Sequence, residues 1–214
     1  IGAMDEEVEQ IVAVMDIERE ETKAQMTFKA GKLAGKDVVI VRSGIGKVNA
    51  AVCTQILVDD FGVDYVINTG IAGSLKNEIN IADIVISDDV LHHDMDATEF
   101  GDPIGQVPRM DVFAFPADKE LVRKAVEANK KANSDIRTFT GRVASGDQFI
   151  SEKEVKERIV NNFGAKCAEM EGAAIAHGAY LNHVPCVIIR AISDKADGSA
   201  QAVSYTHLTL PTIA

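Results

Sequence analysis

The residues with the clearest chemical potential in this sequence are carboxylates that stand near small residues, in three places: Glu6 or Glu7, Glu169 and Glu171, and Asp194. Simple structural explanations exist, because Glu7 and Glu171 suit the first turn of a helix and Asp194 suits a helix N-cap. Together, however, they would gather like charges in an already acidic protein, where a cap could be Ser or Asn. Holding a carboxylate charged against a pKa raised by one unit costs about 1.4 kcal/mol. This grouping therefore indicates a functional site.

Two further motifs have plainer structural interpretations. His92, His93 and Asp94 resemble a metal cluster, but adjacent histidines in an extended segment point to opposite faces, and no third ligand follows at a suitable spacing. We therefore expect a surface or interface loop and no metal. Gly44-Ile45-Gly46 is neither a Walker loop nor a full dinucleotide fingerprint, since Asn49 stands at the third glycine position. A tight strand-to-helix turn is its simplest structural interpretation.

Short apolar runs and amphipathic stretches alternate along the chain. Continuous apolar patterns predict strands over residues 37–41, 63–71, 81–90, 138–144 and 185–189. Helical spacing of apolar residues predicts helices over 47–60, 119–132, 151–160 and 171–181. This alternation predicts the α/β class, with a central, mostly parallel β-sheet flanked by helices. Ligands of such sheets bind beyond the carboxyl ends of the strands, which is where the carboxylates and the glycine-containing segments fall.

Composition excludes several classes of partner. The 214 residues include 22 Lys and Arg against 33 Asp and Glu, a formal net charge of −11, which argues against nucleic acid or an anionic membrane as the main partner. No apolar run approaches the ~20 residues of a membrane span. The acidic start does not resemble a signal peptide. Cys53, Cys167 and Cys186 lie in apolar settings and are expected to be reduced thiols of a cytoplasmic protein.

The two ends of the sequence differ from the rest. Residues 1–4 are expected to be the end of a first strand whose beginning is absent, and residues 202–214 are an atypical tail, expected to be foreign to the fold. The expected organisation is a single domain over residues 1–201, truncated at its N-terminal strand and its C-terminal helix. Exposed core surface would cost ~25 cal/mol per Å², so we expect reduced stability relative to an intact relative.

A set of motifs at consistent spacing resembles a known family. They lie at residues 2–8, 43–48, 68–70, 72–73, 145–147, 168–171 and 190–194. The sequence from Ile1 to about Gly198 resembles bacterial 5′-methylthioadenosine/S-adenosylhomocysteine nucleosidases, within the purine nucleoside phosphorylase superfamily. The resemblance implies a homodimer with a mixed central sheet, hydrolysis of the bond between adenine and ribose in nucleoside catabolism and methionine salvage, and no cofactor.

The resemblance also implies roles for individual residues. Asp194 corresponds to the acid that protonates adenine, held by Ser193, and Glu7 to the base that activates water. Glu171, with Met170 and Glu169, corresponds to the group that binds the ribose hydroxyls. Further substrate contacts are implied for Phe149, Ile150, Ala72, Gly73, Met4 and Ile45. A loop with Ala97, Phe100 and Pro108 corresponds to the segment that reaches into the partner's site.

Elementary chemistry agrees with these roles. Adenine leaves poorly as an anion, so a carboxylic acid that still carries its proton must donate it, and burial in apolar surroundings favours that neutral form. A second carboxylate must stay ionised to take a proton from water, as in glycoside hydrolysis. Three alternatives stay open: a purine nucleoside phosphorylase that uses phosphate, a catalytically silent nucleoside-binding protein, and a dinucleotide-dependent enzyme that rests only on Gly44-Ile45-Gly46.

Overall fold

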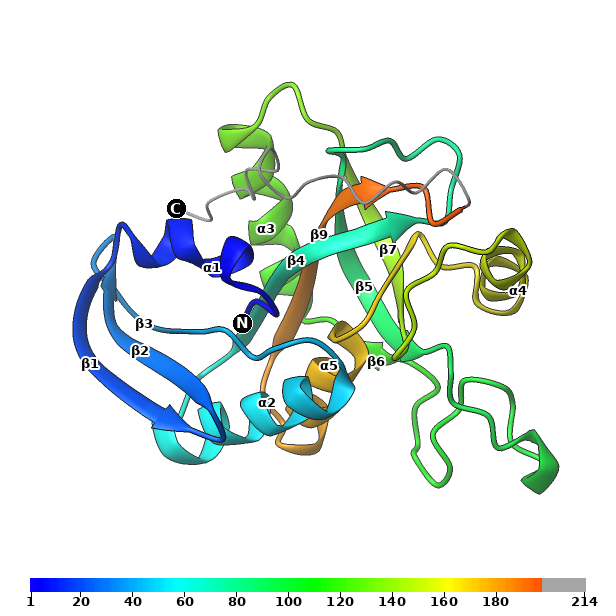
Figure 1. Ribbon diagram of the computed structural model, residues 1–214, viewed down its shortest axis with the longest axis horizontal. Helices are drawn as coiled ribbons and strands as arrows, with labels where there is room; N and C mark the ends of the chain where they lie inside the picture. The colour runs from blue at the N-terminus through cyan, green and yellow to red at the C-terminus, as the bar shows by residue number, and fades with distance from the viewer. Residues whose placement is uncertain (198–214) are drawn as a thin grey trace.

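The computed structural model describes residues 1–197. Its helices are α1 (Asp5–Val12), α2 (Lys47–Phe61), the short 3₁₀ helix η1 (Thr98–Phe100), α3 (Lys119–Ala132), α4 (Lys153–Phe163) and α5 (Gly172–Leu181). Its strands are β1 (Asp16–Lys23), β2 (Met26–Leu33), β3 (Lys36–Val41), β4 (Val66–Ser74), β5 (Ile84–His92), β6 (Phe115–Pro116), β7 (Thr138–Ser145), β8 (Cys167–Glu169) and β9 (Cys186–Asp194). Figure 1 shows their arrangement.

The larger sheet is mixed and closes on itself. Its strand order is β6-β5-β7-β8-β4-β9, and β9 also pairs with β5. The longest pairings, β4 with β9 and β5 with β7, are parallel, whereas β4 with β8 and β5 with β9 are antiparallel. The fold class expected from the sequence, a mixed and mostly parallel sheet flanked by helices, is confirmed.

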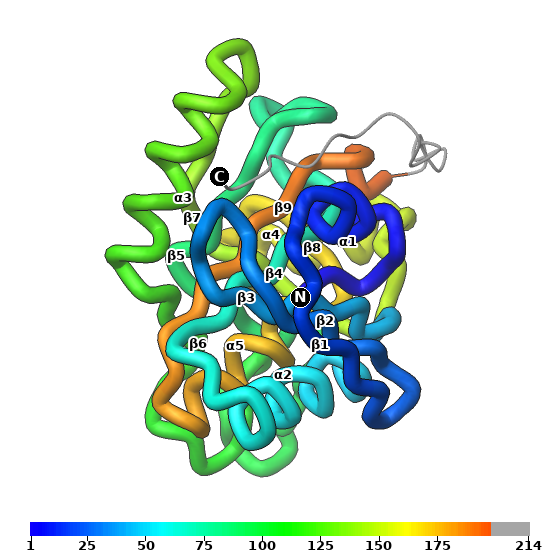
Figure 2. The backbone as a smooth tube through the Cα atoms, turned by 90° about the vertical axis from the view of Figure 1, so that its left-hand side faces the viewer, coloured from blue at the N-terminus to red at the C-terminus, as the bar shows by residue number. Residues whose placement is uncertain are grey.

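Helices pack against this sheet, and the helix that is most buried, α5, is rich in small residues. The alanine-rich α5 packs beside α2 in both views (Figures 1 and 2), because small residues such as Ala173 and Ala176 let the helix lie close to its neighbours. On another side, α3 begins where the carboxylate of Asp118 accepts hydrogen bonds from the N–H groups of Glu120 and Leu121.

A second, antiparallel sheet of β1, β2 and β3 extends from the larger sheet. Residues at the start of the chain connect the two. The N–H of Gly2 donates to the carbonyl of Val41 at 3.2 Å, and the N–H of Thr69 donates to the carbonyl of Ile1 at 3.0 Å. This short extended segment leads directly into α1 and so brings Glu7 to the rim of the larger sheet.

Some predicted boundaries were wrong. The strand expected from residue 81 begins at Ile84, because the Asp83 carboxylate accepts from the N–H of Asn80 at 2.6 Å and closes a turn before it. The strand expected to end at residue 189 continues to Asp194 and carries Arg190 inside the sheet.

The segment after β5 projects from the body (Figure 1). No helix in the described part of the chain is long and apolar enough to cross a membrane. The atypical tail, residues 202–214, lies outside the described residues.

Candidate active site

A cavity opens at the carboxyl ends of the central strands. It is lined by Ala3, Met4, Glu7, Ile45, Ile71, Ala72, Gly73, Gln148, Phe149, Ile150, Ala168, Glu169, Met170, Glu171, Ser193, Asp194 and Ala196. All twelve residues singled out from the sequence are among them, although they come from six separate stretches of the chain. Their individual roles remain predictions at this point.

Glu7 is held in the cavity wall by backbone donors. Its Oε2 atom accepts from the N–H groups of Ala3 at 2.6 Å and Met4 at 3.1 Å, and its Oε1 atom accepts from the N–H of Ile71 at 3.1 Å. Because Ala3 and Met4 precede α1 and Ile71 belongs to β4, the side chain joins the start of the chain to the central sheet. Both oxygens therefore act as acceptors in a fixed orientation.

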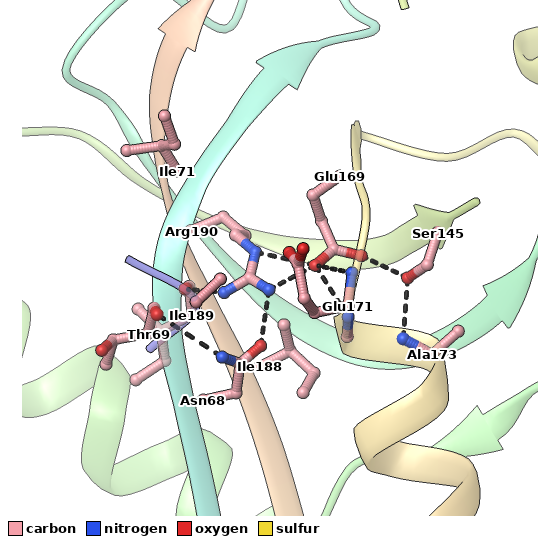
Figure 3. Close-up of polar contacts among 12 residues, drawn as sticks. Asn68, Thr69, Ile71, Ser145, Glu169, Glu171, Ala173, Ile188, Ile189 and Arg190 are labelled. Carbon is pink, nitrogen blue, oxygen red and sulfur yellow. Dashed lines mark hydrogen bonds and ion pairs between the residues drawn. The ribbon is translucent and has the colours of Figure 1, made fainter. Parts of the chain in front are cut away.

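Arg190 and Glu169 form a buried ion pair (Figure 3), and Glu169 also belongs to the cavity lining. The guanidinium donates to Glu169 through Nε at 3.1 Å and through Nη2, and Nη2 also donates to the Oδ1 atom of Asn68. The carboxylate accepts in addition from the hydroxyl of Ser145 and from the N–H of Gly172 at 2.8 Å. The pair thus ties β9 to β4, β7 and the start of α5.

Burial alone would raise the pKa of Glu169. The Arg190 guanidinium and the hydrogen bonds from Ser145 and Gly172 outweigh burial and hold that pKa below its ordinary value. Glu169 is therefore an ionised partner of Arg190, and its side chain is 2% exposed. Its direct access to a ligand in the cavity is small.

Glu171 has the opposite character, although it lies only two residues along the chain. Burial, and then repulsion from Glu169, raise the pKa of Glu171 to about 7. The positive charge of Arg190 and a hydrogen bond at 2.8 Å from the N–H of Gly46 act against this rise. Glu171 is therefore a carboxylate whose charge changes near neutral pH, while its neighbour stays charged.

Asp194 ends β9 on the other side of the cavity. Its Oδ2 atom accepts from the hydroxyl of Ser193 at 2.8 Å, and its Oδ1 atom accepts from the N–H of Ala196 at 2.7 Å. Gly73 makes room for it, since a Cβ atom at that position would lie 2.8 Å from Oδ1. The Ser193 hydroxyl also lies 3.4 Å from the carbonyl of Ala72. If Asp194 takes up a proton, the hydroxyl has this carbonyl as an alternative acceptor.

Apolar side chains complete the lining. Phe149 and Ile45 are 62% and 55% exposed, so each presents a large part of its surface at the open side of the cavity. Met4 and Met170 add flexible, polarizable groups of the kind that suit a thioether. The site therefore combines carboxylates on its inner wall with an aromatic and aliphatic outer wall.

Sequence reasoning assigned no role to Arg190, Asn68 or Ser145. Arg190 is 1% exposed and is buried together with its partner. One signal was available, because a charged residue in the apolar run of β9 must be paired if the strand is buried. Nothing in the sequence identified Asn68 or Ser145 as its neighbours, since they lie far away along the chain.

His92 is the last residue of β5, and both His92 and His93 are buried, so these histidines do not lie on a surface loop. The ring of His92 lies 5.6 Å from that of His177 and 6.0 Å from that of Phe115, centroid to centroid. Burial lowers the pKa of His92 to about 4 and lowers the pKa of His93. Both imidazoles are therefore neutral at neutral pH.

Comparison with known proteins identifies relatives of this chain in both sequence and structure. Residues 1–208 match the family model described as the phosphorylase superfamily. A 5′-methylthioadenosine/S-adenosylhomocysteine nucleosidase of Geobacillus sp. strain WCH70 is 48% identical over 207 residues, 96% of this chain and 88% of that protein. The crystal structure of such a nucleosidase from Colwellia psychrerythraea 34H, in complex with adenine, superposes with a TM-score of 0.91 at 40% identity, covering 97% of this chain and 86% of that one. The nucleosidase of Neisseria meningitidis, in complex with methylthio-immucillin-A, gives 0.91 at 38% identity, covering 97% and 89%.

The fold is thus that of the phosphorylase superfamily. Within this superfamily, the chain belongs to the 5′-methylthioadenosine/S-adenosylhomocysteine nucleosidases, which are N-glycosyl hydrolases.

Proposed function

We propose that this chain hydrolyses the N-glycosidic bond of 5′-methylthioadenosine and S-adenosylhomocysteine, releasing adenine and the thioribose product. One observation carries the proposal. Glu7, Glu171 and Asp194 line one cavity, yet each has a different set of hydrogen-bond partners. A cavity with acidic groups in different environments is suited to acid–base hydrolysis of a glycosidic bond.

Asp194 is proposed as the general acid. When the bond between N9 of adenine and C1′ of ribose breaks, its electron pair moves into the purine. A proton delivered from the protonated Asp194 to N7 makes adenine a neutral leaving group. Ser193 supports this change, because its hydroxyl donates to the ionised carboxylate and can turn toward the carbonyl of Ala72 when the carboxyl is protonated.

Glu7 and Glu171 are proposed to act on the sugar side. Glu7 takes a proton from water as the water oxygen bonds to C1′, and its three backbone donors fix the carboxylate for that step. An ionised Glu171 accepts hydrogen bonds from the ribose hydroxyls, and its negative charge favours the cation-like ribose of the transition state. Acid and base steps each typically contribute ~10²–10⁴ in rate.

The remaining wall residues are proposed to bind the two ends of the substrate. Phe149 stacks on the adenine ring, and the backbone of Ile150 contacts its edge. Ala72 and Gly73 face the base and the sugar. Met4, Ile45 and Met170 surround the sugar and its sulfur-bearing substituent, for which polarizable methionine side chains are suited.

The decisive experiment is adenine release from 5′-methylthioadenosine, with and without phosphate. Release that phosphate leaves unchanged supports hydrolysis, and release that requires phosphate would establish a phosphorylase instead. Asp194→Asn should abolish release while calorimetry still detects nucleoside binding. Full turnover by Asp194→Asn would remove the assignment of the acid, and binding without turnover in the unsubstituted chain would indicate a silent binding protein.

A homodimer is also proposed, in which the loop with Ala97, Phe100 and Pro108 approaches the partner's site. Exposed apolar side chains support this proposal. Phe100 is 88% exposed and Val48 is 76% exposed, and contact with a partner chain would remove such apolar surface from water. Sedimentation should give twice the chain mass of 23.0 kDa, and Phe100→Asp should lower nucleoside affinity. Sedimentation as a monomer would refute the proposal.

The cytoplasm is the proposed location. Cys53, Cys167 and Cys186 are buried and free of disulfide bonds, which suits a reducing compartment. Cell fractionation tests this directly.

A further inference from the structure

Three charged residues outside the cavity lining join separate segments of its rim. Lys47 begins α2, Asp94 follows β5 and Asp147 follows β7; we call these three residues the rim cluster. The Lys47 ammonium donates to both oxygens of Asp94, at 2.6 and 2.8 Å. The side chains of Lys47 and Asp94 are each 20% exposed, so this ion pair is partly shielded from water and less weakened by solvent than a surface pair.

Backbone groups close the rim cluster into a ring. The Oδ2 atom of Asp94 also accepts from the N–H of Asp147 at 3.0 Å. The Oδ1 atom of Asp147 in turn accepts from the N–H of Lys47 at 2.9 Å. Each member thus contacts the other two, and loss of the Asp94 side chain would remove the acceptor of both the Lys47 ammonium and the N–H of Asp147.

The rim cluster is continuous with the proposed substrate site. Asp147 immediately precedes Gln148, Phe149 and Ile150, which line the cavity. On the other side, Lys47 follows Gly46, whose N–H donates to Glu171. The ring therefore joins the segment proposed to bind the base to the residue whose N–H orients the carboxylate proposed to bind the sugar.

Close packing restricts the same junction. A Cβ atom at Gly146 would lie 2.4 Å from the ring of His93 and 3.1 Å from Cγ of Asp94. A Cβ atom at Gly46 would lie 3.2 Å from Oδ1 of Asp147. Backbone and side chains thus meet without intervening space, so a shift of Asp94 is transmitted to the segment that begins at Gly146.

We propose that Lys47, Asp94 and Asp147 are positioning residues for substrate binding, which hold residues 148–150 at the correct distance from Glu171. This rests on the proposed function, because it assigns the base and the sugar to those two sides of the cavity. Loss of the ring leaves the reacting carboxylates in place but lets the base-binding segment move. The expected defect is therefore mainly in KM and in adenine affinity.

The test compares Asp94→Asn and Lys47→Met with a matched control. Asp89→Asn breaks a similar ion pair, in which both oxygens of Asp89 accept from Arg142 at 2.7 Å and the side chains are 28% and 29% exposed. This pair contributes no residue to the cavity lining. Losing a charged hydrogen bond should raise KM for 5′-methylthioadenosine about tenfold or more in the first two variants, with kcat changed by less than about threefold.

Two additional measurements distinguish a role in positioning residues 148–150 from a general loss of protein stability. The guanidinium of Lys47→Arg can contact both oxygens of Asp94. This variant should therefore keep most of the substrate affinity that Lys47→Met loses. Adenine affinity by calorimetry should fall in Asp94→Asn and Lys47→Met and stay near the unsubstituted value in Asp89→Asn. If Asp94→Asn does not fold, the comparison of Lys47→Met with Lys47→Arg decides.

The proposal is overturned if the rim-cluster variants and Asp89→Asn have the same KM and the same adenine affinity, or if kcat falls while KM does not change. Failure of the proposed function has a different signature. In that case the unsubstituted chain itself would release no adenine from 5′-methylthioadenosine, whereas failure of the positioning role would be seen in variants of an active enzyme.

Discussion

The charge state of Glu171 should control activity on the acid side of neutrality. Burial, with repulsion from Glu169, raises the pKa of this carboxyl to about 7. The proposed role requires the ionised form, so protonation removes both the diol acceptor and the negative charge that faces the cation-like ribose. Because the pKa is raised, the active form is lost as pH falls below about 7, far above the usual range for a glutamate.

The magnitude follows from the fraction of ionised carboxylate. With a pKa of about 7, about one molecule in ten keeps the charge at pH 6, so kcat/KM should fall about tenfold from its plateau, and about a hundredfold at pH 5. The assay is initial-rate adenine release between pH 5 and 9 at constant ionic strength. Far-ultraviolet circular dichroism at each pH confirms that the enzyme stays folded.

Glu171→Gln provides the matched variant. The amide oxygen can still accept from the N–H of Gly46, but the side chain no longer titrates. Its residual activity should be low and should lack the decrease below pH 7. A flat profile in the unsubstituted enzyme, or an identical decrease in Glu171→Gln, would refute the assignment of this titration to Glu171.

Three further predictions follow from other contacts of the site and its support. Glu169→Gln removes a charge that raises the pKa of Glu171, so the acid-side decrease in kcat/KM should move to lower pH, and an unmoved profile would contradict this coupling. Gly73→Ala places a Cβ atom 2.8 Å from Oδ1 of Asp194 and 2.9 Å from Cβ of the buried Ala196, so adenine release should fall strongly and the melting temperature should fall with it; normal release would show that Asp194 has freedom to shift. Burial lowers the pKa of His92 to about 4, whereas the unfolded value is near 6.5, so the unfolded chain binds more protons between these values and stability is lost as pH falls through that window. His92 alone should destabilise the fold by about 2 kcal/mol at pH 5 relative to pH 8, and urea unfolding of His92→Gln should show a correspondingly smaller difference.

Periodicity predicted most of the elements that bury apolar residues, and it missed β1, which is exposed, and β2, which buries Met26 and Phe28 but has no longer run of apolar alternation. The helices over α2 and α3 and the strand over β3 were predicted within a residue or two, because their apolar residues repeat at the spacing of the structure. The hairpin of β1 and β2 was not predicted. Residues 16–20 of β1 are all exposed, and the sequence of this strand, DIEREETK, has no apolar alternation to reveal it. Its pairing with β2 defines the strand instead.

The candidate site was predictable to the extent that its residues follow strands. Glu171, Asp194 and either Glu6 or Glu7 could be collected from the rule that ligands bind beyond carboxyl ends, and the family resemblance selected Glu7 and supplied the expected roles. The partners of Arg190 could not be found in this way. Asn68 and Ser145 meet the Arg190–Glu169 pair through the pairing of β4 with β9 and of β7 with β8, which depends on strand order and not on local sequence.

The charges of the cavity lining bear on whether water or phosphate is the attacking group. The described cavity lining holds three glutamates and one aspartate and neither lysine nor arginine. Arg190 is the cation beside them, and Glu169 already engages it through Nε and Nη2. The glutamates therefore leave an excess of negative charge toward the ligand, which repels a phosphate anion and favours a cation-like ribose. The same excess keeps the pKa of Glu171 high, since both Glu169 and Glu7 oppose its ionisation. If the lining excludes phosphate in this way, adenine release should be both independent of phosphate and sensitive to mildly acidic pH, because one excess of negative charge would cause both properties.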